Sequence, residues 1–363
     1  MRQTSLTKNY IIDLDQKLDK LIELYVAVLG ERHRAKITKV LTEIPILFTG
    51  TNDKWIQFVR KANLANKYAS GDKLVPVANL EKVSNYVQNK AKDSAVTKDS
   101  LAFFDIIAKN MRKEDKGVCI DLLTRQMSTY TASCTMEASN DLSEVITYIH
   151  FPLEVRCRDC VLVHELFHAI STFIGKKQNG KAMYGSGLTG MVKVEGDSKE
   201  ELPEGITIKE FEKLNKFNEM FTEYLTQKTI IKMQEQGLKI LNEEEFVSAY
   251  NNGLLFMKYL FEKIEPELID YYIAGDFVGL KNAVGAERFN KLLDLSDAFF
   301  DTIPDILLVS ARVTLEKVRT TQDMIKYADQ LTAKNPSSPF FKKCLEMKNL
   351  TDEIVEQINQ STL

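Results

Sequence analysis

The chain has 363 residues, of which 44% are hydrophobic and 27% are charged, with 16 glycines and 8 prolines. This composition is typical of globular proteins and excludes a disordered or collagen-like chain, and the length predicts two domains or one catalytic domain with a helical extension. The 48 Lys and Arg residues nearly balance the 51 Asp and Glu residues, so the net charge is −3 and nothing indicates nucleic-acid binding.

No segment approaches the roughly 18 consecutive apolar residues that a membrane span needs, and residues 1–17 contain no uninterrupted apolar signal region. The five cysteines are sparse and odd in number, unlike the framework of a small secreted domain. We therefore expect reduced thiols, a cytoplasmic location and no membrane partner. Export without a cleaved signal stays open, and so does the oligomeric state.

The first part of the chain, residues 1–95, is expected to be a helical N-terminal region. Apolar residues recur at helical spacing from about residue 11 to Leu29, and Gly30 follows as a stop. The further helices that the pattern predicts, separated by polar turns, cover residues 38–48, 53–68 and 101–111.

Between residues 117 and 153 the pattern changes to short runs that are rich in β-branched and aromatic residues. Such runs predict the strands of a small sheet, and the clearest run covers residues 145–151. A helix is expected to follow, ending at about Ile174 before Gly175.

Seven glycines lie between residues 175 and 205, which predicts a loop or a loose hairpin without a packed element. Thr207 and Glu210 then have the spacing of a capping box, so a helix is expected from there towards Gly237. The fold class that these patterns predict is α+β and predominantly α-helical. The chain is expected to divide into the helical N-terminal region, a core over residues 96–237 and a helical C-terminal region over residues 238–363.

The motif that carries chemistry lies in the helix expected after the strands. His164, Glu165 and His168 form H-E-x-x-H, which chance alone predicts on the order of 0.003 times in a chain with so few histidines. A helix places positions i and i+4 on one face, so both imidazoles can reach one metal ion while Glu165 projects beside it. The spacing suits one catalytic zinc ion per chain, with Glu165 as the base for its water. The alternative, histidines that are merely hydrogen-bonded in a buried helix, leaves Glu165 as a costly buried charge.

The third ligand is expected to be a carboxylate. In the metzincin pattern a Gly and a third His follow the motif, but this chain has Ser171 and Ile174 at those positions and no later histidine. Glu219 and Glu223 lie at i and i+4 of the next predicted helix and would repel each other unless a cation lay between them. We therefore predict that Glu219 binds the metal and that Glu223 accepts the second N–H of a ligand imidazole.

Two alternatives to this assignment remain open. The acidic pair could be only the solvated face of a surface helix. Another carboxylate could also be the ligand, although the rivals lie in the glycine-rich segment, where preorganisation is poorer; they are Glu195, Glu200, Glu201 and Glu204.

The pair of motifs, His164-Glu165-x-x-His168 and Asn218-Glu219-x-x-Thr222-Glu223, resembles the gluzincin metallopeptidases, the clan of the thermolysin-like enzymes and the lethal-factor-like toxins. The resemblance implies a zincin-like catalytic core, with a small mixed sheet over the H-E-x-x-H helix and an edge strand that aligns an extended peptide. Residues 145–151 are the candidate for that strand. It also implies zinc-dependent hydrolysis of a peptide or protein substrate, with Glu219 as third ligand and Glu165 as general base.

A gluzincin usually adds a Tyr or His that donates to the developing oxyanion. The sequence does not identify this residue. Tyr250 is the first candidate, and Tyr184, Tyr224 and His150 are others, although with 13 tyrosines in the chain the ordinary expectation for each tyrosine is a packing role.

Cys157 and Cys160 form C-x-x-C shortly before the motif. No second pair lies at ribbon spacing, so helix packing is the expected role, with a redox pair or half of a metal site as alternatives. Two other functions also stay open besides the peptidase. One is a zinc-binding interaction or sensory protein with a lost activity, and the other is a toxin- or effector-type metallopeptidase with one dedicated protein target.

Overall fold

The computed structural model describes residues 18–44, 46–49, 58–59, 133–139, 141–152, 159–197, 200–237, 251–300 and 318–361. Most of these residues are helical, and the predicted α+β, predominantly helical class is confirmed. The helices are α2 (Leu18–Leu29), η1 (Glu31–His33), α3 (Arg34–Glu43), α8 (Asp159–Ile170), α9 (Ile208–Glu235), α10 (Asn251–Ala274), α11 (Phe277–Val284), α12 (Ala286–Phe300), α14 (Thr321–Lys326), α15 (Ala328–Lys334) and α16 (Pro339–Ser361). The strands are β1 (Ile46–Thr49), β2 (Phe58–Val59), β3 (Ser133–Ala138), β4 (Val145–Pro152), β5 (Thr172–Ile174), β6 (Lys181–Ser186), β7 (Thr189–Val194) and β8 (Glu200–Glu201).

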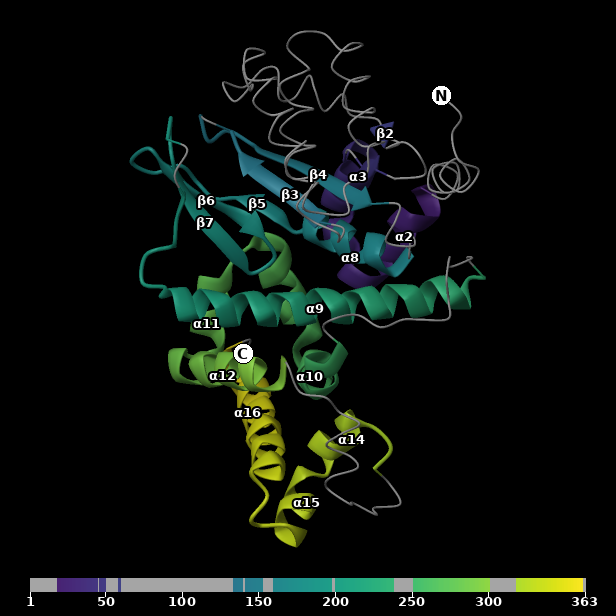
Figure 1. The fold of residues 1–363 in the computed structure, drawn as a ribbon, viewed down its shortest axis with the longest axis vertical. Helices are drawn as coiled ribbons and strands as arrows, with labels where there is room; N and C mark the ends of the chain where they lie inside the picture. The colour runs from purple at the N-terminus through teal and green to yellow at the C-terminus, as the bar shows by residue number, and fades with distance from the viewer. Residues whose placement is uncertain are drawn as a thin grey trace, which may run out of the picture.

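Helix α9 runs across the middle of the molecule (Figure 1). The two sheets lie with α2, α3 and α8 on one side of it, and α11, α12 and α14 to α16 lie on the other side. It contacts α2, α8, α10 and α12. Because it is covered from several directions, its apolar residues, among them Phe217, Phe221 and Leu225, are fully buried in the main core.

Helix α9 begins and ends where the sequence predicts. The Thr207 hydroxyl accepts from the Glu210 N–H, and the Glu210 carboxylate accepts from the Thr207 N–H, so the capping box is confirmed. Past its C-terminus Gly237 has a φ of 64°, a left-handed conformation that suits glycine. The capped helix holds Glu219 and Glu223 in its middle turns, away from its fraying ends.

The N-terminal region is only partly helical. Helix α2 ends at Leu29 before Gly30, as predicted. The helix expected over residues 38–48 is wrong in its second half, because α3 stops and β1 follows. The cause is Pro45, which disfavours a helical conformation at the residue before it, and Ile44 is indeed extended with a ψ of 128°.

Residues 58–59 form β2, so the helix expected over residues 53–68 is wrong at these two positions. They pair antiparallel with Leu47 and Phe48 of β1, and this pairing overrides the local helical spacing. The helix expected over residues 101–111 lies outside the described residues.

The first sheet has the strand order β2-β1-β4-β3. Strand β1 runs parallel to β4, while the other pairs are antiparallel, so the sheet is mixed. Strand β4 contains the predicted strand 145–151, but it lies between β1 and β3. The expectation that this segment is the edge strand is therefore wrong, and within the described part of the chain β3 forms that edge.

Helix α8 ends at Ile170, earlier than the expected end at Ile174. The Ser171 hydroxyl donates back to the Phe167 carbonyl at 2.9 Å, a local bond that competes with further helix. The next three residues, with two β-branched side chains, form β5 and pair with β6.

The glycine-rich segment is not a loose loop, and that expectation is wrong. It forms a second, antiparallel sheet with the strand order β5-β6-β7-β8, in which Ala182, Tyr184 and Leu188 are buried. Two of its glycines are required by close packing. A Cβ on Gly185 would lie 2.0 Å from the Thr189 carbonyl oxygen, and one on Gly187 would lie 2.1 Å from Asn218 Oδ1. These glycines permit close backbone contacts.

The described residues of the C-terminal region are helical, from α10 to α16. Helix α10 is kinked at Ile264, two residues before Pro266, whose ring cannot fit a regular helix interior. One hydrophobic core joins residues of α2, α8, α9, α10, α12 and α16. The domain boundaries at residues 95 and 237 stay predictions. Among the described helices, none is long and apolar enough to cross a membrane.

Candidate metal centre

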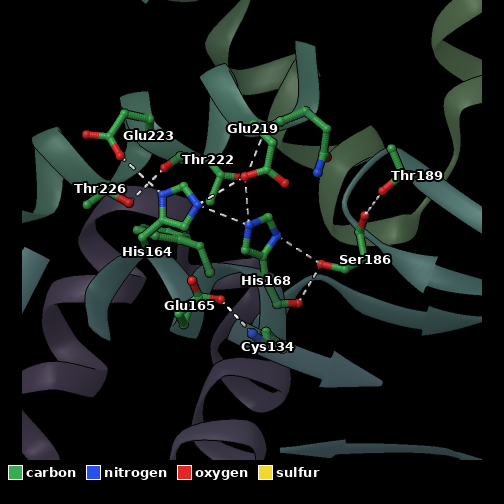
Figure 2. A network of polar contacts seen from close by, with 12 residues as sticks. Cys134, His164, Glu165, His168, Ser186, Thr189, Glu219, Thr222, Glu223 and Thr226 are labelled. Carbon is green, nitrogen blue, oxygen red and sulfur yellow. Dashed lines mark hydrogen bonds and ion pairs between the residues drawn. The ribbon is translucent and has the colours of Figure 1, made fainter. Parts of the chain in front are cut away.

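Helices α8 and α9 pack together and bring the two sequence motifs to one place (Figure 2). Helix α8 carries His164 and His168 one turn apart, and α9 presents Glu219 to both rings. Helix α2 supports α8 from behind, since the Tyr25 ring packs 4.7 Å from that of Phe167 and its hydroxyl donates to the Val163 carbonyl. The ligand-bearing face of α8 is therefore held in place by buried packing on the neighbouring face of the same helix.

Three possible ligand atoms form a nearly equilateral triangle. His164 Nε2 lies 3.1 Å from His168 Nε2 and 3.2 Å from Glu219 Oε2, and His168 Nε2 lies 3.4 Å from Glu219 Oε2. Two ligand atoms that bind a tetrahedral zinc ion at about 2.05 Å are about 3.3 Å apart. The three edges therefore match one face of such a tetrahedron, and the group could hold a metal ion.

The charges of this group are strongly coupled. Burial acts to lower the pKa of His164, but hydrogen bonds to Glu219 and Glu223 and the charge of Glu165 outweigh burial and raise the pKa to about 10. Burial acts to raise the pKa of Glu219, but the two histidines outweigh it and hold the pKa well below its usual range. A cation bound here would displace a proton from His164, because a ligand imidazole must be neutral.

Glu223 lies on the other side of His164 from Glu219 (Figure 2). Its Oε2 is 3.1 Å from His164 Nδ1, and the residue is only 2% exposed. The second oxygen accepts from Gln227. A carboxylate in this place fixes the imidazole with its proton on Nδ1 and leaves Nε2 to bind a metal. Glu223 thus lies within hydrogen-bonding distance of His164 Nδ1, and its role in supporting a metal ligand stays a prediction.

Glu165 points from α8 towards β3 (Figure 2). Its Oε2 accepts the backbone N–H of Cys134 at 2.6 Å. This N–H is therefore directed away from β4. Backbone groups alternate in direction along a strand, so those of every second residue of β3 face the same way. The Ala138 carbonyl is one of them, and it accepts from the Lys193 ammonium. The side of β3 that faces away from β4 therefore adjoins Glu165 at Cys134 and the buried Lys193 at Ala138.

No family model, curated protein or solved structure matches the chain. The resemblance to the gluzincins accordingly rests on the two motifs. Among the described residues, the group of three side chains that could hold a metal is the predicted set of His164, His168 and Glu219.

The rival carboxylates of the glycine-rich segment lie elsewhere. Glu195 pairs with Lys177 at 2.5 Å, and Glu201 pairs with Lys181 at 2.9 Å. Glu200 accepts from Tyr184, and Glu204 is exposed. None of the four joins the triangle.

Neither of the two oxyanion-donor candidates with a described side chain, Tyr184 and Tyr224, is bonded to the triangle. The Tyr184 hydroxyl donates to Glu200 within the second sheet, and the Tyr224 hydroxyl donates to Glu265 of α10 at 3.1 Å. Tyr250 lies outside the described residues, as does the side chain of His150. Cys157 and the side chain of Cys160 also lie outside them, so the C-x-x-C hypothesis stays a prediction.

A buried polar layer behind the ligands was missed by the sequence reasoning. The Thr222 hydroxyl lies 2.8 Å from that of Tyr272, and both residues are fully buried. Thr226 and Thr229 continue the same buried face of α9. Threonines at positions 222, 226 and 229 have helical spacing, and this pattern is the signal that could have indicated a polar core face.

Proposed function

We propose that the protein is a zinc-dependent metallopeptidase of the gluzincin type with a zincin-like catalytic core. The observation that carries this proposal is the triangle of ligand atoms, whose edges of 3.1 to 3.4 Å suit tetrahedral coordination. His164, His168 and Glu219 would hold the ion. When bound, zinc lowers the pKa of a water to about 7 and polarises a carbonyl group.

The chemistry of the donor set favours zinc over the hard cations. Calcium and magnesium take oxygen ligands, whereas two imidazoles and one carboxylate are typical of zinc. Catalytic zinc sites have three protein ligands, the number that the described residues supply, while structural sites have four.

Glu165 would act as the general base. It follows the first ligand histidine on the same helix, and the N–H of Cys134 holds its carboxylate in place. A carboxylate there is placed to take a proton from the attacking water and to return it to the leaving amine. A purely structural zinc site needs no such base, and this favours an enzyme over an interaction module.

An extended peptide would bind along β3. Glu165 already accepts from the Cys134 N–H, and the carbonyl of the buried Ala138 already accepts from Lys193, so the peptide would pair with the outward backbone groups between them, at Met136. Main-chain bonds to such an edge can recruit a peptide as an added strand. This edge ends beside Glu165. A scissile bond aligned on β3 would therefore lie next to both the base and the ligand triangle.

The test combines metal content with cleavage. Purified protein should contain about one zinc ion per chain by mass spectrometry of the metals. Glu219→Ala should lose the zinc, whereas Glu212→Ala, at an exposed position of the same helix, should keep it. Glu165→Gln should keep the zinc but no longer cleave a peptide library in which the wild-type cleavage sites are mapped. Undiminished zinc in Glu219→Ala would contradict the ligand assignment, and cleavage by Glu165→Gln would contradict the mechanism.

A further inference from the structure

The turn between β6 and β7, residues 186–189, touches the helix that carries the two histidines. The Ser186 hydroxyl donates to the His168 carbonyl at 2.7 Å and lies 3.4 Å from His168 Nδ1 (Figure 2). It also lies 3.0 Å from the Ser171 hydroxyl, and the Gly187 N–H donates to the Ser171 carbonyl at 3.3 Å. The turn is thus hydrogen-bonded to the last turn of α8 and to the residue after it.

The same turn is also bonded to the helix that carries the third ligand. The Leu188 N–H donates to Asn218 Oδ1 at 2.8 Å, and Asn218 directly precedes Glu219. Asn218 is 1% exposed and Leu188 is fully buried. Because water cannot replace this bond, losing it would leave a buried polar group without its partner.

The contact is too close for any residue but glycine at position 187. Gly187 has a φ of 58°, and a Cβ there would lie 2.1 Å from Asn218 Oδ1 and 2.6 Å from Tyr272 Cε2. A side chain would therefore push the turn away from α9. This steric requirement joins the second sheet to the ligand helices through one short turn.

We propose that the β6–β7 turn positions His168 relative to Glu219, with Ser186 as a positioning residue for His168 and Asn218 as the anchor of the turn. This inference rests on the proposed function in taking His168 and Glu219 as zinc ligands. A neutral His168 that binds through Nε2 carries its proton on Nδ1. Ser186 Oγ is placed to accept a hydrogen bond from this Nδ1–H, while the Ser186 hydroxyl donates its own hydrogen bond to the His168 carbonyl.

The first test removes the hydroxyl of Ser186. Ser186→Ala should weaken zinc binding by about 10- to 100-fold in competition with a chromophoric chelator. It should also shift the visible absorption bands of the cobalt-substituted protein, because these bands report the coordination geometry. The matched control is Ser296→Ala, which removes another fully buried hydroxyl bonded to a backbone carbonyl, that of Leu292, in α12. The control should leave both measurements unchanged.

The second test compares two glycines that both have positive φ. Gly187→Ala should displace the turn and weaken zinc binding by about tenfold or more. Gly196→Ala imposes similar backbone strain at a φ of 72°, but its Cβ would meet nothing within 4 Å, so zinc binding should stay at the wild-type level. If Gly187→Ala does not fold, Ser186→Ala decides the question.

The outcomes separate this inference from the proposed function. Wild-type protein that binds neither zinc nor cobalt contradicts the proposed function itself. If the wild type binds zinc and Ser186→Ala matches it in both affinity and cobalt spectrum, the positioning role is wrong while the zinc site stands. Equal losses in Ser186→Ala and Ser296→Ala would indicate a general effect of core destabilisation and would also overturn the inference.

Discussion

The backbone N–H of Cys134 lies 2.6 Å from Oε2 of Glu165, so the edge strand of the first sheet holds the carboxylate that we propose as the general base. The link is made by the main chain and is therefore independent of the residue type at position 134, with proline as the exception. Burial, followed by the charges of Glu165 and Glu219, raises the pKa of the Cys134 thiol, so the thiol is neutral.

This relationship predicts different effects for two substitutions at one position. Cys134→Pro removes the N–H, which does not belong to the β3–β4 ladder, and proline is tolerated at such places on edge strands. Loss of a hydrogen bond to a charged group, about 1.5 to 3 kcal/mol, should reduce kcat for peptide hydrolysis about 10- to 100-fold without loss of zinc. Cys134→Ala, which keeps the N–H, should retain wild-type kcat. Equal kcat in the two variants would contradict a role for this N–H.

The bond between Glu223 and His164 predicts the effect of neutralising a buried carboxylate. Glu223→Gln keeps the shape of the side chain but weakens the acceptor for His164 Nδ1, so zinc affinity should fall about 10- to 100-fold. The measurement is competition with a chelator at constant pH. Glu267→Gln, at an exposed position of α10, is the control. Unchanged affinity in Glu223→Gln would mean that the carboxylate does not support the ligand.

Lys36 predicts a pH dependence of stability. Its ammonium donates to the Ile273 carbonyl at 2.8 Å, and burial lowers its pKa to about 8. The unfolded chain therefore binds more protons than the folded chain between pH 8 and about pH 10, and stability rises with pH in that window. The free energy of unfolding of the wild type, relative to that of Lys36→Met, should increase by up to about 3 kcal/mol between pH 7 and pH 10. Chemical denaturation at several pH values measures the difference, and a pH-independent difference would contradict the prediction.

The local features of the site could be predicted from the sequence because each depends on a short spacing. His164 and His168 share a face at i and i+4, and the capping box at Thr207 sets the start of α9. The repulsion expected between Glu219 and Glu223 indicated that something lies between them, and the structure places the His164 ring there.

The features that the sequence did not indicate depend on contacts between distant residues. Strand β4 lies inside the sheet because Ile149 pairs with Ile46, more than a hundred residues away, and no local pattern encodes that partner. The glycine-rich segment was misjudged for a different reason. Glycine serves flexible loops and close contacts alike, and in this chain it is the positions of Thr189 against Gly185 and of Asn218 against Gly187 that distinguish the two.

The position of α9 between the two halves has a consequence for how much the ligand set can move. Glu219 and Glu223 lie on a helix that contacts α8 as well as α10 and α12, so the backbone that carries both carboxylates cannot shift without disturbing the core that it shares with those helices. Backbone amides around Glu219 should therefore exchange with deuterium only when the entire protein unfolds, with or without metal. Little of the free energy of metal binding would then be spent on ordering the site.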